Sequence, residues 1–484
     1  MLVQPSNWAA HESFLGRERE LARLEAWWGE SDAQPINLYG RRRVGKSWLL
    51  RRFAHGKPAI ILVAERTTAA LQRAKMADEL EPLLGMRPEI RDIGELFKIL
   101  YRLGSTERIL IVVDEFPYLL GSSGGEVSDN LTSIQAALEQ NRDGSRAKLI
   151  ICGSIVTQME ELQSLRSPLH GRFDRFVLEP MEFREARLFT PTLDVVEQFT
   201  RYSISGGMPR YLRAFQKADL VEALATEVVD SNSPLFNEAM SVLQSELREP
   251  GVYLGILGAL TANPADVAAI SAATGLESKA LSPYLERLAN MGLIRRRLPV
   301  GAATNARSGQ WQCRDEFMRF WFRFVRPYQA DLEAGSDARH HVNHHIVPRL
   351  ADQTAGPFEE ALRRWIRREF PSAAICGPWW GNSLHAQRRA GTRHTEEIDA
   401  VAIRGKSVVV VAEAKWTNAP MALNVLADLD EYKLPALQQA GLSIADDVQR
   451  VLTSRSGFSR AIQRQAADDS NIRLISAVDL LQDI

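Results

Sequence analysis

The stretch from Ile36 to Phe53, INLYGRRRVGKSWLLRRF, constrains the fold more than any other part of the sequence. Its apolar start predicts a buried strand at 36–39, and the apolar periodicity after Lys46 predicts a helix. Between them, the run GRRRVGKS has the spacing of a phosphate-binding loop, in which glycines let backbone N–H groups surround phosphate oxygens. We therefore predict a strand, loop and helix that together bind a nucleoside triphosphate.

This loop predicts specific contacts with ATP and Mg²⁺. Lys46 is expected to reach the β- and γ-phosphates and the Ser47 hydroxyl to hold Mg²⁺, while the positive end of the helix adds to phosphate binding. An ordinary glycine-rich turn is the alternative, but the flanking strand and helix favour phosphate binding. The expected ATP-binding residues are Gly40, Arg41, Arg42, Arg43, Val44, Gly45, Lys46, Ser47 and Trp48.

Apolar strands and amphipathic helices alternate after this loop. Strands are expected at 59–64, 109–113 and 148–152. Such alternation indicates an α/β fold with a mostly parallel sheet and helices on both faces. The second of these strands ends in two adjacent carboxylates, which predict Asp114 beside Mg²⁺ and Glu115 as the group that orients or deprotonates the attacking water. The alternative is a strand that ends in a solvated acidic turn.

Five short motifs occur in order along the first half of the chain: GRRRVGKS, IVVDE, CGS, HGRF and GGMPRYL. Together they resemble the archaeal-type ATPase family, a branch of the AAA+/STAND superclass that is also found in bacteria. The resemblance implies a P-loop, AAA+-like ATPase domain with a helical lid over residues 1–246. It also implies catalytic roles for Ser154, which would sense the γ-phosphate, and Arg172, which would contact it in cis or across the subunit boundary of a homo-oligomer. For Arg172 the alternative is a surface ion pair with Asp174 or Glu179.

The middle of the chain predicts three short helices followed by a strand. The helices are expected at 252–260, 266–274 and 278–291, and a strand that enters a wing is expected after Gly292. This order resembles a winged helix-turn-helix domain, which we place at residues 247–314.

Two functions are open for this middle domain. In one, Ser278, Lys279 and Ser282 lie on the solvent side of a recognition helix, and the arginines at 295–297 contact DNA phosphates. In the other, the domain is a protein spacer and its arginines are merely solvated. The sequence does not decide between them.

The C-terminal third begins with an aromatic-rich segment. Residues 315–350 are expected to form a helical linker whose aromatic side chains pack in a core. Farther on, Asp399 precedes an apolar strand that begins at Ser407, and Glu413 and Lys415 then point to one face because strand side chains alternate. Two carboxylates on a metal and an ammonium beside the attacking water are the components of metal-assisted phosphodiester hydrolysis.

This spacing resembles the PD-(D/E)xK nuclease superfamily. The resemblance implies an α/β restriction-endonuclease-like domain over residues 351–484, with catalytic roles for Asp399, Glu413 and Lys415. Metal contacts are implied for Asp399, Glu413 and the helical carboxylate Glu359. A departure from the superfamily pattern is the isoleucine that stands where a proline usually precedes the aspartate. The alternative is a nuclease-like fold that serves only in packing or DNA binding.

Composition limits the remaining classes of protein. The 484 residues are 45% hydrophobic and 25% charged, with a formal net charge of -1, which indicates a globular chain long enough for several cores. The sequence has no apolar run long enough to span a membrane and no signal pattern, so we expect a cytoplasmic protein without a membrane partner. The three cysteines lack a C-x-x-C spacing, which argues against a disulfide framework or a thiolate zinc site.

These observations lead to competing functional hypotheses. In the first, an ATP-hydrolysing AAA+/STAND-type module that uses Mg²⁺ is coupled to a metal-dependent nuclease-like domain acting on DNA. In the second, the chain is a nucleotide-switched regulatory DNA-binding ATPase with a catalytically silent C-terminal domain. A DNA-binding scaffold that recruits other enzymes is a third, and it predicts salt-dependent DNA affinity without cleavage.

Overall fold

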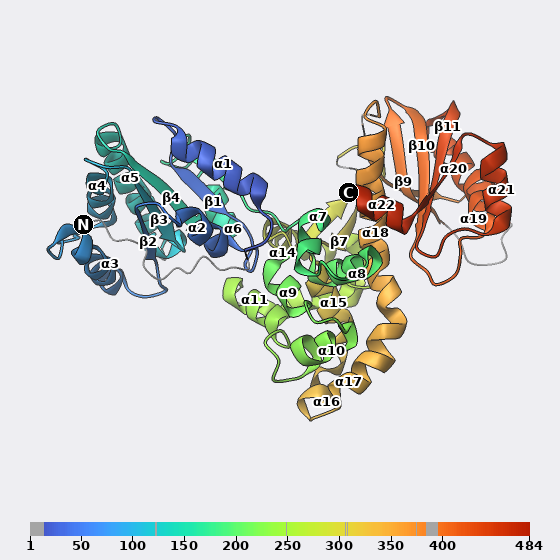
Figure 1. Ribbon diagram of the computed structural model, residues 1–484, viewed down its shortest axis with the longest axis horizontal. Coiled ribbons are helices and arrows are strands. Elements are labelled where there is room, and N and C mark those ends of the chain that lie inside the picture. Colours follow the sequence, from blue (N-terminus) through green and yellow to red (C-terminus); the bar gives the residue numbers. More distant parts are fainter. Residues whose placement is uncertain are drawn as a thin grey trace. The chain divides into compact units, whose positions relative to one another are not determined.

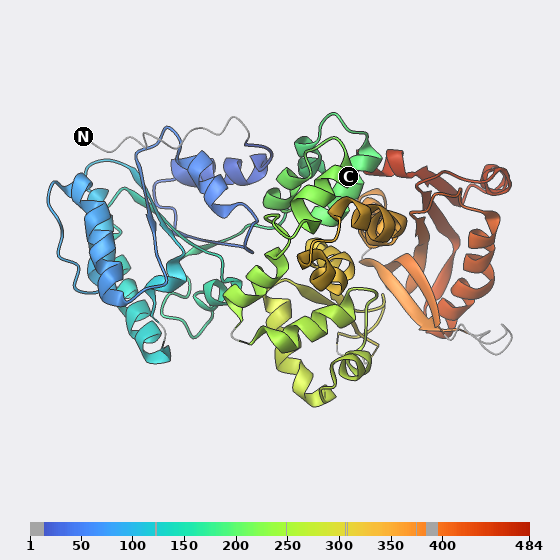
Figure 2. The same cartoon turned by 90° about the horizontal axis from the view of Figure 1, so that it is seen from below.

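The computed structural model of the protein divides into two compact units. Unit 1 ends at Leu188 and also includes Met208–Arg210, while unit 2 comprises Phe189–Gly207 and Tyr211–Ile484. Each unit has its own five-stranded sheet (Figure 1, Figure 2). The structure describes residues 14–121, 123–247, 249–304, 306, 308–373, 375–383 and 395–484.

The sheet of unit 1 is parallel throughout, with the strand order β2-β3-β4-β1-β5. All six residues of β3 are buried, as the apolar run at 109–113 predicts. The parallel α/β architecture expected for the ATPase-like domain is therefore confirmed. Its strands are β1 (Ile36–Tyr39), β2 (Ala59–Val63), β3 (Ile109–Asp114), β4 (Ala147–Gly153) and β5 (Asp174–Val177).

The helices of unit 1 pack their apolar faces on this sheet. Ile111 of β3, Phe97 of α4 and Ile134 of α5 belong to one buried cluster. The Asp92 side chain begins α4 by accepting a hydrogen bond from the Glu95 backbone N–H at 2.8 Å. The helices are α1 (Glu18–Gly29), α2 (Lys46–Ala54), α3 (Ala69–Leu84), α4 (Ile93–Leu103), α5 (Gly124–Asn141), α6 (Val156–Glu161) and α7 (Phe183–Ala186), with a 3₁₀ turn η1 (Phe116–Leu119) after β3.

The strand order determines which loops meet. Because β4 lies between β3 and β1, the carboxyl ends of these three strands are adjacent at one edge of the sheet. The loops that follow them begin at Glu115, Ser154 and Gly40. The amino ends of the same strands form the opposite edge.

The first part of unit 2 is helical. The aromatic segment predicted near residue 315 forms α15, in which Phe317, Phe320 and Trp321 are buried. The Trp321 indole N–H donates to the Phe236 carbonyl at 2.5 Å, and the Phe317 ring stacks on Tyr211 at 4.2 Å. The helices here are α8 (Val195–Ser205), α9 (Pro209–Ala214, whose first two residues belong to unit 1), α10 (Leu220–Leu224), α11 (Glu238–Glu246), α15 (Glu316–Phe324), α16 (Gln329–Glu333) and α17 (Ala338–His341).

Three helices and a two-stranded antiparallel sheet occupy the middle of the sequence. Asp266 begins the second helix with a side-chain bond to the Ala269 backbone N–H at 2.7 Å. Leu281, Leu285 and Leu288 form the buried face of the third. This order agrees with the elements expected there, although the winged-helix assignment stays a prediction. The elements are α12 (Pro250–Leu260), α13 (Val267–Thr274), α14 (Ser278–Asn290), β6 (Ile294–Arg297) and β7 (Gln310–Cys313).

The C-terminal sheet has the order β12-β11-β10-β9-β8 and is mixed. Strands β8, β9 and β10 pair antiparallel, and β10, β11 and β12 pair parallel. Within the described residues, no helix is both long and apolar enough to cross a membrane. The elements are α18 (Leu350–Glu369), β8 (Ile375–Asn382), β9 (Thr395–Arg404), β10 (Ser407–Lys415), α19 (Leu423–Asp428), η7 (Leu429–Lys433), α20 (Leu434–Gln439), β11 (Ser443–Ser454), α21 (Arg460–Asp468), β12 (Ile472–Ser476) and α22 (Ala477–Asp483).

Candidate functional site

The loop between β1 and α2 depends on its two glycines. Gly45 precedes α2 with a φ of 95°, a left-handed conformation that side chains beyond glycine rarely adopt. Gly40 is required for a different reason, because an added Cβ would lie only 2.3 Å from the Leu178 carbonyl oxygen. Arg43, also at positive φ (69°), is exposed, while Arg41 and Arg42 are half-buried. The loop thus follows the tight path expected of a phosphate-binding loop.

The Lys46 side chain folds back over this loop. Its Nζ donates to the carbonyl oxygens of Gly40 at 2.7 Å and Arg41 at 3.1 Å, and the residue is buried. Burial lowers the pKa of Lys46, and nearby Asp114 and Glu115 oppose that shift. A cation held in this position can exchange carbonyl oxygens for phosphate oxygens without a large movement of the backbone.

The predicted residues of β3 and β4 meet the start of α2. The Ser47 hydroxyl donates to Asp114 Oδ2 at 3.0 Å, and the Ser154 hydroxyl donates to Glu115 Oε2 at 3.0 Å. Glu115 has a φ of 52°, and its backbone N–H donates to Asp114 Oδ1 at 2.9 Å. The structure therefore brings Lys46, Ser47, Asp114, Glu115 and Ser154 together at the carboxyl edge of the sheet.

Arg172 lies apart from this group. It is exposed in the loop between α6 and β5, and its guanidinium pairs with Glu139 of α5. Neither of the carboxylates expected from the sequence, Asp174 or Glu179, is that partner. The contacts described for Arg172 do not include a residue of the loop at Gly40.

Arg17 is a residue of this site that the sequence did not indicate. It is 2% exposed, its Nη2 donates to the Val44 carbonyl at 3.0 Å, and its Nη1 pairs with Glu20 at 2.8 Å. The Arg17 backbone N–H donates to Glu185 Oε1 at 2.6 Å. Arg17 therefore joins the phosphate-binding loop to the start of α1. A single arginine among charged neighbours does not contribute to an apolar repeat, so periodicity could not identify it. Its position at the start of a predicted helix was the available signal.

A second set of charged residues lies on the C-terminal sheet. Ala400 of β9 faces Ala412 of β10, which brings Asp399 next to Glu413. Lys415 Nζ lies 2.9 Å from Glu413 Oε2 and 3.6 Å from Asp399 Oδ2. The two carboxylates predicted to bind metal therefore share one ammonium group.

Lys433, at the end of η7, also belongs to this second set. Its Nζ lies 2.5 Å from Glu413 Oε1, and Glu413 is 1% exposed. Burial raises the pKa of Glu413, Asp399 raises it further, and the two lysines oppose the shift. Burial lowers the pKa of Lys415, but Asp399 and Glu413 outweigh it and hold the pKa above the usual value.

The helix α18 brings Glu359 and Arg363 to the same strands. Burial and the charge of Asp399 raise the pKa of Glu359 to about 8. Arg363 Nη1 lies 3.5 Å from Glu359 Oε2 and donates to the Asp399 carbonyl at 2.6 Å. Within the described ranges, no group of three or more His, Cys, Asp or Glu side chains is positioned to hold a metal ion. The donor set on this sheet is thus the Asp399 and Glu413 pair, with Glu359 bound to its own arginine.

The arginines predicted to contact DNA are engaged within unit 2. Arg295 lies 3.6 Å from Glu360, Arg296 donates to two backbone carbonyls, and Arg297 pairs with Glu397 at 2.7 Å. On α14, the side chains of Ser278, Lys279 and Ser282 are exposed. This arrangement does not decide between DNA binding and a spacer role for the middle domain. To bind DNA phosphates, the three arginines would have to leave these protein partners.

Two known protein families match separate parts of the chain. Residues 14–215 match a family described as "ATPase domain predominantly from Archaea", and residues 321–427 match one described as "Archaea bacterial proteins of unknown function". The first match contains every residue predicted to bind or hydrolyse ATP. It supports the predicted ATPase domain in the first half of the chain. The second match contains Glu359, Asp399, Glu413 and Lys415.

Curated relatives and solved structures are also similar to this chain. An uncharacterized protein of Methanocaldococcus jannaschii is 26% identical over 412 residues, covering 84% of this chain and 88% of the relative. An uncharacterized ATP-binding protein of that organism is 50% identical over 44 residues, covering 9% of this chain and 75% of the relative. The Walker-type ATPase of Pyrococcus abyssi has a TM-score of 0.49 at 21% identity, covering 65% of this chain and 97% of that chain. The Orc1 protein of Aeropyrum pernix, solved in complex with DNA, has a TM-score of 0.33 at 16% identity, covering 66% and 94%.

Proposed function

We propose that this chain binds and hydrolyses ATP in unit 1 and that the C-terminal sheet carries a metal-dependent nuclease-like centre acting on DNA. The observation that carries the ATPase part is the 3.0 Å hydrogen bond between Ser47 and Asp114, which joins the phosphate-binding loop to the end of β3. A hydroxyl and a carboxylate on neighbouring elements are the protein groups that hold Mg²⁺ beside nucleotide phosphates.

Each residue of the ATP site has a distinct role in this proposal. Lys46 would bind the β- and γ-phosphates, and Ser47 and Asp114 would hold Mg²⁺, which supplies charge neutralisation at the transferred phosphate when it is bound. Glu115 would orient the attacking water and accept its proton. Ser154, which contacts Glu115, would couple that carboxylate to the state of the γ-phosphate.

The C-terminal proposal rests on Lys415, whose ammonium contacts both Asp399 and Glu413. These residues fit a divalent cation because Asp399 and Glu413 already share one cationic group, the Lys415 ammonium, at 3.6 and 2.9 Å. A metal bound by Asp399 and Glu413 would polarise the scissile phosphate. Lys415 would stabilise the charge that develops, and Lys433 would hold Glu413 in place.

A second function is favoured by the same contacts. Glu413 is held by two lysines, and Glu359 is bound to Arg363, so the charges on this sheet are already balanced within the protein. In that case the chain is a cytoplasmic, nucleotide-switched regulator that binds DNA, alone or as a homo-oligomer, and its C-terminal domain is catalytically silent.

A cleavage assay separates the two functions. Supercoiled, linear and branched DNA would be incubated with the full chain in Mg²⁺ or Mn²⁺, with and without ATP. The variants are Lys415→Ala, Lys46→Ala and, as a matched control, Lys406→Ala, which removes an exposed lysine from the turn between β9 and β10. Cleavage that is lost in Lys415→Ala, kept in Lys406→Ala and altered only in its ATP response in Lys46→Ala is the expected result. ATP hydrolysis without cleavage of any substrate would reject the nuclease and leave the regulator.

A further inference from the structure

Unit 1 contains a pocket of about 620 Å³ at the edge of its sheet opposite the ATP site. Pro35, Arg108 and Ala147 line it, and these residues stand at the amino ends of β1, β3 and β4. The phosphate-binding loop follows the carboxyl end of β1, so the two sites are separated by the length of the strands. A volume of this size is typical of pockets for small ligands.

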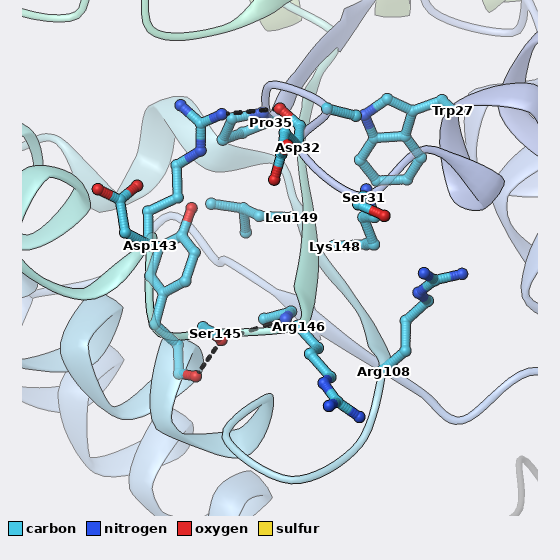
Figure 3. A pocket seen from close by; sticks show the side chains of 14 residues that line it. Trp27, Ser31, Asp32, Pro35, Arg108, Asp143, Ser145, Arg146, Lys148 and Leu149 are labelled. Carbon is cyan, nitrogen blue, oxygen red and sulfur yellow. Dashed lines mark hydrogen bonds between the residues drawn. The ribbon is translucent and has the colours of Figure 1, made fainter.

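Positive charge gathers around this pocket (Figure 3). Arg108, Arg142, Arg146 and Lys148 line it, against the two carboxylates of Asp32 and Asp143. Figure 3 shows Asp143 on the side of the pocket away from Arg108. No ion pair joins any of the four cations to a carboxylate in the part of the chain that the structure describes. The lining of the pocket therefore carries more cations than carboxylates.

The cations are held in place by neutral groups. Arg142 donates to Gln34 Oε1 at 2.7 Å and to the Asp32 carbonyl at 3.0 Å, and Arg146 donates to a backbone carbonyl at 3.2 Å. Lys148 is buried, and its ammonium donates to the Glu30 carbonyl. Burial lowers the pKa of Lys148 and Arg108 lowers it further, while the carboxylates of Glu30 and Asp32 oppose the shift. Like charges are thus kept close together at an energetic cost that a bound anion would relieve.

A buried hydroxyl without a partner also lines the pocket. Tyr101 is 3% exposed, and its hydroxyl has no hydrogen-bond partner among the described residues. Burial raises the pKa of this phenol, so it remains protonated and can donate. An unsatisfied buried hydroxyl costs about 1–3 kcal/mol, which makes such groups rare unless a ligand or water completes them.

The turn beside Tyr101 is built tightly enough to keep this arrangement fixed. The Ser145 hydroxyl donates to the Tyr101 carbonyl at 2.5 Å, and the Arg146 backbone N–H donates to the Gly104 carbonyl at 2.7 Å. An added Cβ at Gly104 would lie 2.3 Å from the Ala147 nitrogen. The end of α4 and the start of β4 are therefore locked together around the pocket.

We propose that this pocket binds a phosphate-bearing anion at a site distinct from the ATP site. Guanidinium groups match the geometry of phosphate oxygens, and several cations with one phenol donor suit a ligand with more than one phosphate group. The phosphates could come from a free oligophosphate compound or from the backbone of a single-stranded nucleic acid. The site does not depend on the C-terminal carboxylates.

Calorimetric titration of the full chain tests this site. The ATP site is first saturated with Mg²⁺ and a non-hydrolysable ATP analogue, and tripolyphosphate or a short oligonucleotide without terminal phosphates is then added in separate titrations. We expect one equivalent of one of these probes to bind, and the probe that binds identifies the source of the phosphate. Binding of neither probe overturns the proposal.

Variants locate the binding. Arg108→Ala combined with Arg146→Ala should weaken it about tenfold or more, and Tyr101→Phe, which removes a single oxygen, about fivefold. Arg102→Ala removes an exposed arginine of α4 and should leave the affinity unchanged. ATP hydrolysis by each variant shows that its unit 1 is folded. If the double variant does not fold, Tyr101→Phe still tests the site. Equal affinity in the wild type, the double variant and Tyr101→Phe would show that the probe binds elsewhere and reject the site.

Discussion

The contact between Arg17 and the phosphate-binding loop allows a quantitative test of how that loop is held. Arg17 Nη2 lies 3.0 Å from the Val44 carbonyl, and Nη1 lies 2.8 Å from Glu20. Arg17→Met keeps most of the buried volume but leaves both acceptors without this donor. Hydrogen bonds that involve a charged group contribute about 1.5–3 kcal/mol each, and part of the loss is recovered by solvation at Glu20. We expect the free energy of unfolding of unit 1 to fall by about 2 kcal/mol.

The same substitution should weaken ATP binding, because Val44 is inside the loop that surrounds the phosphates. If half of the lost energy is expressed as disorder of the loop, the Kd for ATP with Mg²⁺ rises about fivefold. Arg17→Lys retains the charge but lacks the forked geometry, so its effect should be intermediate. Arg19→Met, at an exposed position of α1, is the matched control and should change neither quantity.

The assay combines urea unfolding, followed by tryptophan fluorescence, with direct titration of a fluorescent ATP analogue. Because the chain has two units, the transition to compare is the one whose midpoint moves when ATP and Mg²⁺ are added. If Arg17→Met lowers the stability of unit 1 but binds ATP as tightly as the wild type does, Arg17 does not shape the loop and the reasoning is refuted.

Three further substitutions test other contacts. Gly40→Ala should weaken ATP binding about tenfold or more, because its Cβ would lie 2.3 Å from the Leu178 carbonyl oxygen. Gly29→Ala, a control with open space around the added Cβ, should bind ATP normally in the same titration. Trp416→Ala should lower the free energy of unfolding of unit 2 by about 3–5 kcal/mol in urea, because the indole packs on two phenylalanine rings at 4.8 and 5.5 Å; a loss below about 1 kcal/mol would contradict this packing. Burial and the charge of Asp399 raise the pKa of Glu359 to about 8, above its usual 4.5. Folded unit 2 therefore binds this proton more readily than the unfolded chain does. The stability of unit 2 should fall as the pH rises from about 4.5 to 8. Unfolding measured in metal-free buffer should show this slope in the wild type and a flatter one in Glu359→Gln, and identical slopes would contradict the assignment.

Local patterns in the sequence were sufficient for the elements of the ATP site and for the alternation of strands and helices around it. The strand at 36–39, the helix from Lys46 and the buried β3 follow from apolar runs and from glycine spacing, which act over a few residues. The roles expected for Ser47 and Asp114 beside one Mg²⁺ also required these two residues to lie close together, as they do. Alternation along β10 was enough to place Glu413 and Lys415 on one face.

Only the tertiary structure decided which charged groups meet across long stretches of sequence. Arg17 donates to the Val44 carbonyl, Lys433 contacts Glu413, and Arg172 pairs with Glu139. The pocket at the amino edge of the sheet likewise combines residues from α1, α4 and the starts of three strands. Burial of apolar side chains repeats with the period of a helix or strand and is therefore visible in the sequence. The partner of a charged side chain is determined by which carbonyl or carboxylate packing brings within about 3 Å, and that distance has no counterpart in sequence spacing.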